Sequence, residues 1–104
     1  MKLLSIDTVP GCEIEALGMV KGAVVQTKHF GKDFMAGLKT LVGGEIVAYT
    51  EMLNEARQIA TKRMVDEAEE LGADAIVGVR YGSSQVMQGA AEVIAYGTAV
   101  VFTD

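Results

Sequence analysis

Apolar and polar residues alternate along the first long stretch of the chain, from Glu13 to Thr27. A period of two predicts a β-strand. One face would carry Ile14, Ala16, Val20 and Val24, and the other Glu13, Glu15, Leu17, Met19, Lys21 and Val25. Gly18 and Gly22 fall on the apolar side, where they would allow a bend or the close approach of another element. Residues 2–6 predict a shorter strand before it, and Pro10-Gly11 a turn between the two.

The centre of the chain changes to helical spacing. A short helix is predicted by the helical spacing of Phe30, Phe34, Leu38 and Leu41. Residues 28–32 would be a loop or a frayed helix start, Asp33 would stand at the N-cap or in the first turn, and Gly43-Gly44 would end the helix. A longer helix follows, with Met52 and Ile59 widening its apolar stripe. That stripe consists of Tyr49, Leu53, Ala56, Ala60, Met64, Ala68 and Leu71. Gly72 stands where a helix ends in the left-handed conformation.

Two more strands complete the predicted fold. In the first, Ala75, Val77, Val79 and Tyr81 would share a face and alternate with Asp74, Ile76, Gly78 and Arg80. Residues 83–91 predict a turn or loose hairpin, and Glu92 to Phe102 the last strand. The order β-β-α-α-β-β predicts a single α+β domain over residues 1–104, with an antiparallel sheet and helices on one of its faces.

The last strand is apolar on both faces. Val93, Ala95, Ala99 and Val101 alternate with Ile94, Tyr96, Val100 and Phe102. One face can pack on the long helix, but the other needs a cover, because strands of antiparallel sheets more often have one wet face. Residues 1–6 or the short helix could supply that cover within one chain. We favour sheet-to-sheet contact between subunits of a homo-oligomer.

Composition supports a partner made of protein. The chain has 104 residues, half of them hydrophobic, and a mean hydropathy of +0.29, which is more apolar material than one small core needs. Its longest uncharged apolar run, Val93 to Phe102, is about half of the roughly 20 residues of a membrane span. No signal peptide is recognisable after Met1. We therefore expect no membrane partner.

Net charge and cysteine content limit the expected partners and the expected cellular compartment. The net charge is −5, and the nine Lys and Arg residues are scattered. Nucleic-acid binding is therefore not expected, because phosphate backbones attract clustered basic residues. Cys12 is the only cysteine, so an intrachain disulfide is impossible and a reducing cytoplasm is the expected compartment.

Several segments resemble the YbjQ-like family. They are Val42-Gly43-Gly44-Glu45 leading to Ala48-Tyr49, then Ala56-Arg57, the run from Glu67 to Val79, Leu17 to Gly22, and Gly97 to Val101. The resemblance covers nearly the whole chain. It implies a dodecin-like α+β subunit that assembles into a closed ring, a pentamer, around a β-barrel. Members of this family are often labelled as heavy-metal-binding, so a heavy-metal ion is the cofactor that the resemblance implies.

Two residues are candidates for a soft-metal site, Cys12 and His29. Soft metals select thiolate, imidazole and thioether ligands, and a closed zinc site takes four. Without a CxxC, HxH or HxxxH pattern, one chain cannot build such a site. A ring could gather copies of Cys12, or of a methionine such as Met87, around its axis. The alternative is that Cys12 is an ordinary buried or strand-edge thiol and that His29 has no metal role.

Catalytic chemistry finds little support. A thiolate–imidazolium pair of Cys12 and His29 would have to span a strand of roughly 50 Å. No GxSxG, HExxH or phosphate-loop pattern is present. We therefore predict a protein that is not an enzyme.

Three further groups of residues could bind ligands. Asp66, Glu67, Glu69 and Glu70 crowd the end of the long helix, where we expect Lys62–Asp66 and Arg63–Glu67 pairs to offset their charge. A cation or a neighbouring subunit could do the same. The dodecin-like fold that the resemblance implies can hold a flavin between aromatic rings, and the candidates for such stacking are Tyr49, Tyr81 and Tyr96. Gly43-Gly44 could cradle a phosphate, but no Lys, Ser or Thr directly follows, and a tight connection between helices is the favoured interpretation.

Overall fold

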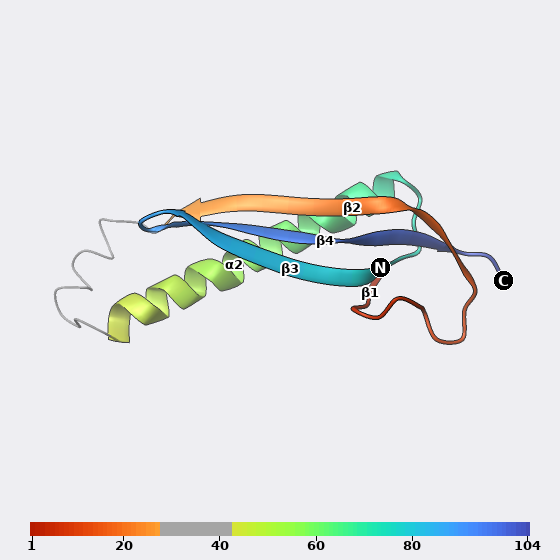
Figure 1. Cartoon of the computed structure of the whole chain (residues 1–104), viewed down its shortest axis with the longest axis horizontal. Helices are drawn as coiled ribbons and strands as arrows, with labels where there is room; N and C mark the ends of the chain where they lie inside the picture. The colour runs from red at the N-terminus through yellow and green to blue at the C-terminus, as the bar shows by residue number, and fades with distance from the viewer. Residues whose placement is uncertain (28–42) are drawn as a thin grey trace.

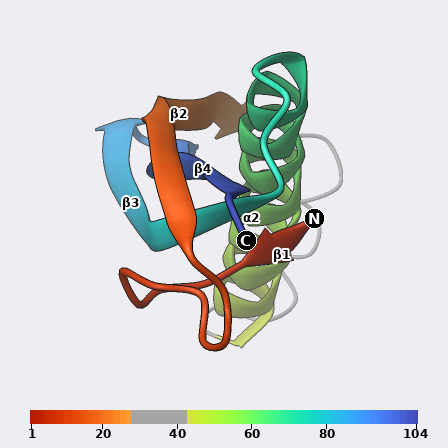
Figure 2. The same ribbon diagram turned by 90° about the vertical axis from the view of Figure 1, so that its right-hand side faces the viewer.

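The chain folds as an α+β domain, as the sequence predicts. The computed structural model describes residues 1–27 and 43–104. It contains β1 (Lys2–Leu3), β2 (Ile14–Thr27), α2 (Gly43–Glu70), β3 (Ala75–Met87) and β4 (Ala90–Phe102). The strands form one sheet in the order β1-β3-β4-β2, and α2 lies on one of its faces (Figures 1 and 2). The predicted short first helix lies outside the described residues.

The sheet is mixed rather than wholly antiparallel. The long strands β2, β4 and β3 pair antiparallel as expected, whereas β1 pairs parallel to β3. β1 is also shorter than the predicted run over residues 2–6. Residues beyond it still follow β3, because Leu4 N–H donates to the Ile76 carbonyl at 2.9 Å and the Ile6 carbonyl accepts from Gly78 N–H at 2.8 Å.

The β3–β4 hairpin is tighter than predicted. Residues 83–87, expected in a turn or loose hairpin, belong to β3, and β4 begins at Ala90. Gln88 and Gly89 make the turn, with Gly89 at a φ of 79°. The prediction was wrong because Ser83, Ser84 and Gln85 are polar on both faces. They nevertheless continue the ladder, with Ser83 opposite Val93 and Ser84 opposite Glu92.

A β-bulge in β2 moves its first residues to the other face. Ala16 lies opposite Val100, but Gly18 lies opposite Ala99, so that Leu17 is the extra residue. One inserted residue reverses the alternation of side chains. Ile14 and Ala16 therefore do not share a face with Val20 and Val24, contrary to the prediction.

A second bulge has the same effect in β3. Val77 lies opposite Thr98 and Arg80 opposite Tyr96, which leaves two residues of β3 facing Gly97 alone. Gly78 accommodates this with a φ of 62°. The predicted common face of β3 is therefore wrong, because Val79 and Tyr81 lie on the side of α2 while Ala75 and Val77 lie on the opposite side. In β4 the predicted alternation is confirmed, with Val93, Ala95 and Ala99 in the core against α2 and Val100 in a second cluster on the opposite face.

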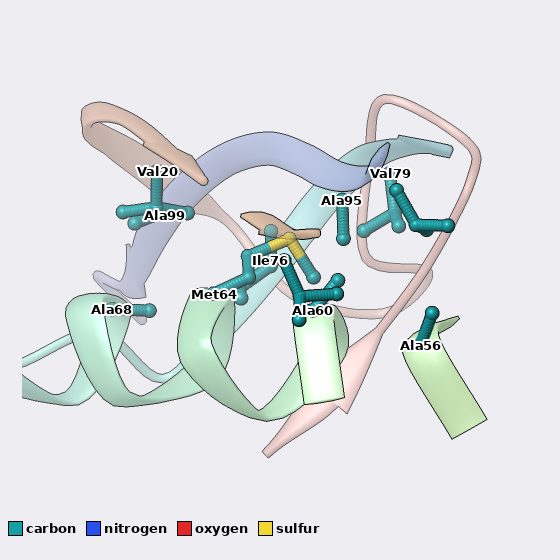
Figure 3. Close-up of a cluster of buried hydrophobic side chains, with 11 residues drawn as sticks. Val20, Ala56, Ala60, Met64, Ala68, Ile76, Val79, Ala95 and Ala99 are labelled. Atoms are coloured by element: carbon teal, nitrogen blue, oxygen red, sulfur yellow. The ribbon is translucent and has the colours of Figure 1, made fainter. Parts of the chain in front are cut away.

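The main core lies between α2 and the sheet and is built largely from small residues. Ala56, Ala60, Met64 and Ala68 of the predicted helical stripe are completely buried (Figure 3). They face Val20 from β2, Ile76 and Val79 from β3, and Ala95 and Ala99 from β4. Leu71, also predicted in the stripe, is exposed because the helix ends at Glu70.

The end of α2 has the predicted form. Gly72 adopts a φ of 79°. Its N–H donates to the Glu69 carbonyl at 3.0 Å, and Ala73 N–H donates to the Ala68 carbonyl at 3.1 Å. This pair of bonds is a Schellman motif, which satisfies carbonyl groups that the helix itself leaves unpaired.

Gly22 is where α2 comes closest to β2. A Cβ at this position would lie 2.1 Å from the Ala60 carbonyl oxygen and 2.4 Å from the Met64 nitrogen. No side chain other than hydrogen fits there. The expectation that this glycine permits close approach of another element is therefore confirmed.

A smaller cluster covers one end of the opposite face of the sheet, which we term the outer face. Val9 packs there with Ala75, Val77 and Val100, and Leu4, Cys12 and Ile14 lie against them. The chain before β2 thus covers part of the outer face itself, through a longer segment than the residues 1–6 considered from the sequence.

We expect Gly22→Ala to destabilise the fold by about 3 kcal/mol, because the added methyl group overlaps the backbone of α2. Gly82→Ala is the matched control, since its Cβ would lie 3.5 Å from Ile94 Cγ2, an ordinary contact, and its effect should stay below about 1 kcal/mol. Urea unfolding of both variants measures the difference. Equal stabilities would contradict the proposed packing of α2 on β2.

Candidate functional site

The outer face remains exposed over most of its length. Register places Lys21, Tyr96 and Arg80 side by side on this face, with Ala23, Ile94 and Gly82 in the next row. Met19 is 71% exposed, Val25 57% and Tyr96 39%. Large apolar side chains gathered on one open face indicate an interaction surface, whereas scattered ones need no explanation.

The chain is also more extended than a compact monomer of its size. Its Cα radius of gyration is 17.3 Å, whereas a compact domain of this length has about 13 Å. Its accessible surface is 6703 Å², against about 5,600 Å² expected for its mass. The excess of about 1,100 Å² is more than the ~800 Å² that one partner buries in a standard interface.

An open groove lies between α2 and β3. It has a volume of about 710 Å³ and is lined by Asn54, Arg57, Gln58, Thr61, Lys62 and Tyr81. The Tyr81 and Thr61 hydroxyls are hydrogen-bonded at 2.8 Å, and Thr61 also donates to the Arg57 carbonyl at 2.7 Å. These bonds fix the floor of the groove by joining β3 to the helix.

The cations of the groove differ in their partners. The Lys62 ammonium donates to Asp66 at 2.9 Å, and this hydrogen bond and the Asp66 charge raise the pKa of Lys62. Arg57 donates to the neutral Asn54 side chain. No carboxylate among the described residues is paired with Arg57, so its positive charge in the groove is not neutralised there, in a chain whose net charge is −5.

Side chains of α2 form hydrogen bonds with the outward-pointing backbone groups in the middle of β2. Lys21 N–H donates to Glu67 Oε1 at 3.4 Å, and Arg63 Nη1 donates to the Ala23 carbonyl at 2.6 Å. These backbone groups point away from β4 and would otherwise be open to another strand. The predicted Lys62–Asp66 pair is confirmed, but the Arg63–Glu67 pair is not formed, because both side chains reach β2.

The candidate metal ligands are not brought together by the described residues. Cys12 is half-buried against the Val9 cluster, and its N–H donates to the Val9 carbonyl at 3.0 Å. His29 lies outside the described residues. Met87 is exposed at the hairpin, at the opposite end of the sheet from Cys12. Over residues 1–27 and 43–104 there is no group of three or more His, Cys, Asp or Glu residues that could hold a metal ion.

The aromatic candidates also lie apart from one another, and the two glycine candidates belong to a helix. Tyr81 lies on the α2 side of the sheet and Tyr96 on the outer face, so these two rings cannot stack on one ligand within one chain. Tyr49 is half-buried on α2. Gly43 and Gly44 form the first turn of α2 rather than a connection before it. The groove itself was missed from the sequence, because the bulge at Gly78 is what turns Tyr81 toward the helix.

The described part of the chain contains no helix long and apolar enough to cross a membrane. Its fold places it in a class of small α+β domains, with one long helix on one face of a sheet and the other face largely exposed. A solved structure shares this fold with a TM-score of 0.64 at 16% identity, covering 99% of this chain and 98% of the other. That structure is of a protein of unknown function from Pediococcus pentosaceus, of the DUF74 family.

The sequence comparisons give the family. Residues 1–103 match the YbjQ family model, described as "Putative heavy-metal-binding". A UPF0145 protein from Clostridium novyi is 62% identical over 96% of this chain and 97% of its own length. A UPF0145 protein from Thermus thermophilus is 58% identical over 92% of this chain and 85% of its own length. The chain belongs to the YbjQ family, as the resemblance in its motifs indicates.

We expect Tyr81→Phe to lower the free energy of unfolding by about 1 kcal/mol, because it removes the hydrogen bond that joins β3 to Thr61. Tyr96→Phe on the outer face is the control. No hydrogen bond of its hydroxyl occurs within the described residues, and its stability should change less. Denaturant unfolding measures both variants. A larger loss for Tyr96→Phe would contradict the role assigned to the Tyr81 hydroxyl.

Proposed function

We propose that this protein is a non-catalytic homo-oligomer of the cytoplasm, and that a closed ring, a pentamer, is its functional unit. The observation that carries the proposal is the bare outer face, with Met19, Val25 and Tyr96 exposed. If the helices lie on the outside of the ring, the sheet faces opposite α2 point toward the ring axis and cover one another. The extended shape and the excess accessible surface of one chain support the same proposal.

The two edges of the sheet support a ring rather than a simple dimer. β2 forms one edge of the sheet, and β3 forms the other edge beyond the segment that is paired with the start of the chain. Both strands pair antiparallel with β4 and therefore run parallel to each other. When one edge of a subunit meets the other edge of the next, each copy makes the same head-to-tail contact. Such a heterologous interface closes into a ring if its rotation is suitable.

Val25→Lys should convert the assembly to monomers at micromolar concentration, because closing the ring would bury several ammonium groups near one another. Val47→Lys on α2 is the matched control, since both valines are 57% exposed in one chain. Native mass spectrometry of the untagged protein measures the mass of each. A monomeric wild-type protein would refute the proposal, and a Val25→Lys variant that stays assembled would refute the role of the outer face.

A second candidate function is the binding of a heavy-metal ion by ligands shared between subunits. The description of the family model favours it. Cys12 and His29 are the candidate ligands from the sequence, and a shared site would use copies of one residue around the ring axis. The half-buried position of Cys12 in an apolar cluster supports the competing interpretation, an ordinary structural thiol.

Cys12→Ala tests this second function. If the thiol is a ligand, the variant should lose most of the metal that the wild-type ring retains, measured by elemental analysis of both proteins after the same dialysis against zinc or cadmium. His29→Ala separates the contribution of the imidazole. Equal metal content in the wild type and both variants would exclude these residues as ligands while leaving the ring unaffected.

A further inference from the structure

Beyond the bonds that Gly78 and Val79 make to Ile6 and Leu4, the edge of β3 has no partner strand among the described residues. β1 pairs with Ala75 and Ile76 alone. Because Lys21 N–H points away from β4, its partner Tyr96 directs its backbone groups toward β3 and bonds there to Arg80. The backbone groups of Tyr81, Ser83 and Gln85 must then point outward. Among the described residues no strand pairs with this segment, 81–85, which we term the open edge.

The groove lies beside the open edge on its α2 side. Tyr81, Ser83 and Gln85 lie opposite Ala95, Val93 and Ala91, so their side chains are on the face of the sheet that α2 covers. Arg57 and Lys62 line the groove above that face. A strand edge next to a helix groove is the arrangement in which proteins accept an added strand. The positive charge of Arg57 favours an occupant with a carboxylate on its α2 side.

The start of β2 has outward-pointing backbone groups and a carboxylate on the α2 face of its own sheet. Thr103 N–H donates to the Glu13 carbonyl at 2.9 Å, so Glu13 and Glu15 direct their backbone groups toward β4, and Ile14 and Ala16 direct theirs outward. Glu15 lies opposite Val101, on the α2 face of its own sheet. Strand addition is confined to residues 13–16, because Leu17 forms a bulge and because the Lys21 N–H and the Ala23 carbonyl are already bonded to α2 side chains.

We infer that residues 13–16 of a second copy add to the open edge as a parallel strand and place Glu15 against Arg57. When the two strands pair, the sheets of the two copies become continuous and their α2 faces lie on the same side. Glu15 of the second copy therefore lies on the α2 side of the first copy's sheet, where the groove is. The free segment of β2, residues 13–16, is similar in length to the open edge, residues 81–85. The contact also staggers one subunit along the next, and a closed sheet needs such a stagger. This inference rests on the proposed ring and specifies which edges close it.

Ser83→Pro tests the backbone bonds. Proline removes an N–H that points outward, so the β3–β4 ladder is spared, whereas strand addition loses a donor and meets the proline ring. Ser83→Ala keeps the N–H and is the control. We expect Ser83→Ala to assemble like the wild type and Ser83→Pro to be a folded monomer, by native mass spectrometry and circular dichroism. An assembled Ser83→Pro beside an assembled wild type would overturn the inference and leave the ring standing. A monomeric wild type would overturn both.

A charge exchange tests the side-chain contact even if Ser83→Pro fails to fold. Arg57→Glu should weaken association at least tenfold, because it faces Glu15 with a second carboxylate. Glu15→Arg alone should do the same, and the double variant should recover most of the loss. Sedimentation velocity over a concentration series measures association, and Glu55→Arg on α2 is the control for a charge reversal elsewhere. Two single variants that associate like the wild type, or a double variant no better than either, would overturn the pairing.

Discussion

The contact between α2 and β2 at Gly22 is the constraint on which the rest of the structure depends. The helix backbone lies so close that a methyl group at Gly22 would overlap the Ala60 carbonyl. Alanines on the facing side of α2 make this distance possible, because larger side chains would hold the helix away. The helix is thereby placed over β2 and β4, and its side chains reach past β2 to bond that strand's outer backbone groups.

The two edges of the sheet differ because of this placement. Over β2 the helix lies close, and Arg63 and Glu67 occupy the middle of the edge. Over β3 the helix leaves a groove floored by Tyr81 and Thr61, and the neighbouring edge has no strand beside it in the described chain. Within the described residues, α2 side chains cover the middle of one edge of the sheet, whereas part of the other edge and most of one face have no cover.

The family model is described as heavy-metal-binding, but the described residues of this chain do not form a metal site. Soft metal ions need several thiolate or imidazole ligands in one place, whereas Cys12 packs in an apolar cluster and the described residues hold no cluster of ligands. The described residues of one chain therefore supply no complete metal site of their own.

The sequence by itself determined the elements that periodicity reports: the long strand, the helix with its alanine stripe, the stop at Gly72 and the two-faced last strand. It determined the family as well, through motifs spread along the chain. Only the tertiary structure decided which face each residue occupies, because the bulges at Leu17 and Gly78 reverse the alternation and leave no mark on a pattern of period two. The groove and the open edge follow from those reversals and from the approach of α2, which depend on pairing between residues far apart in the chain.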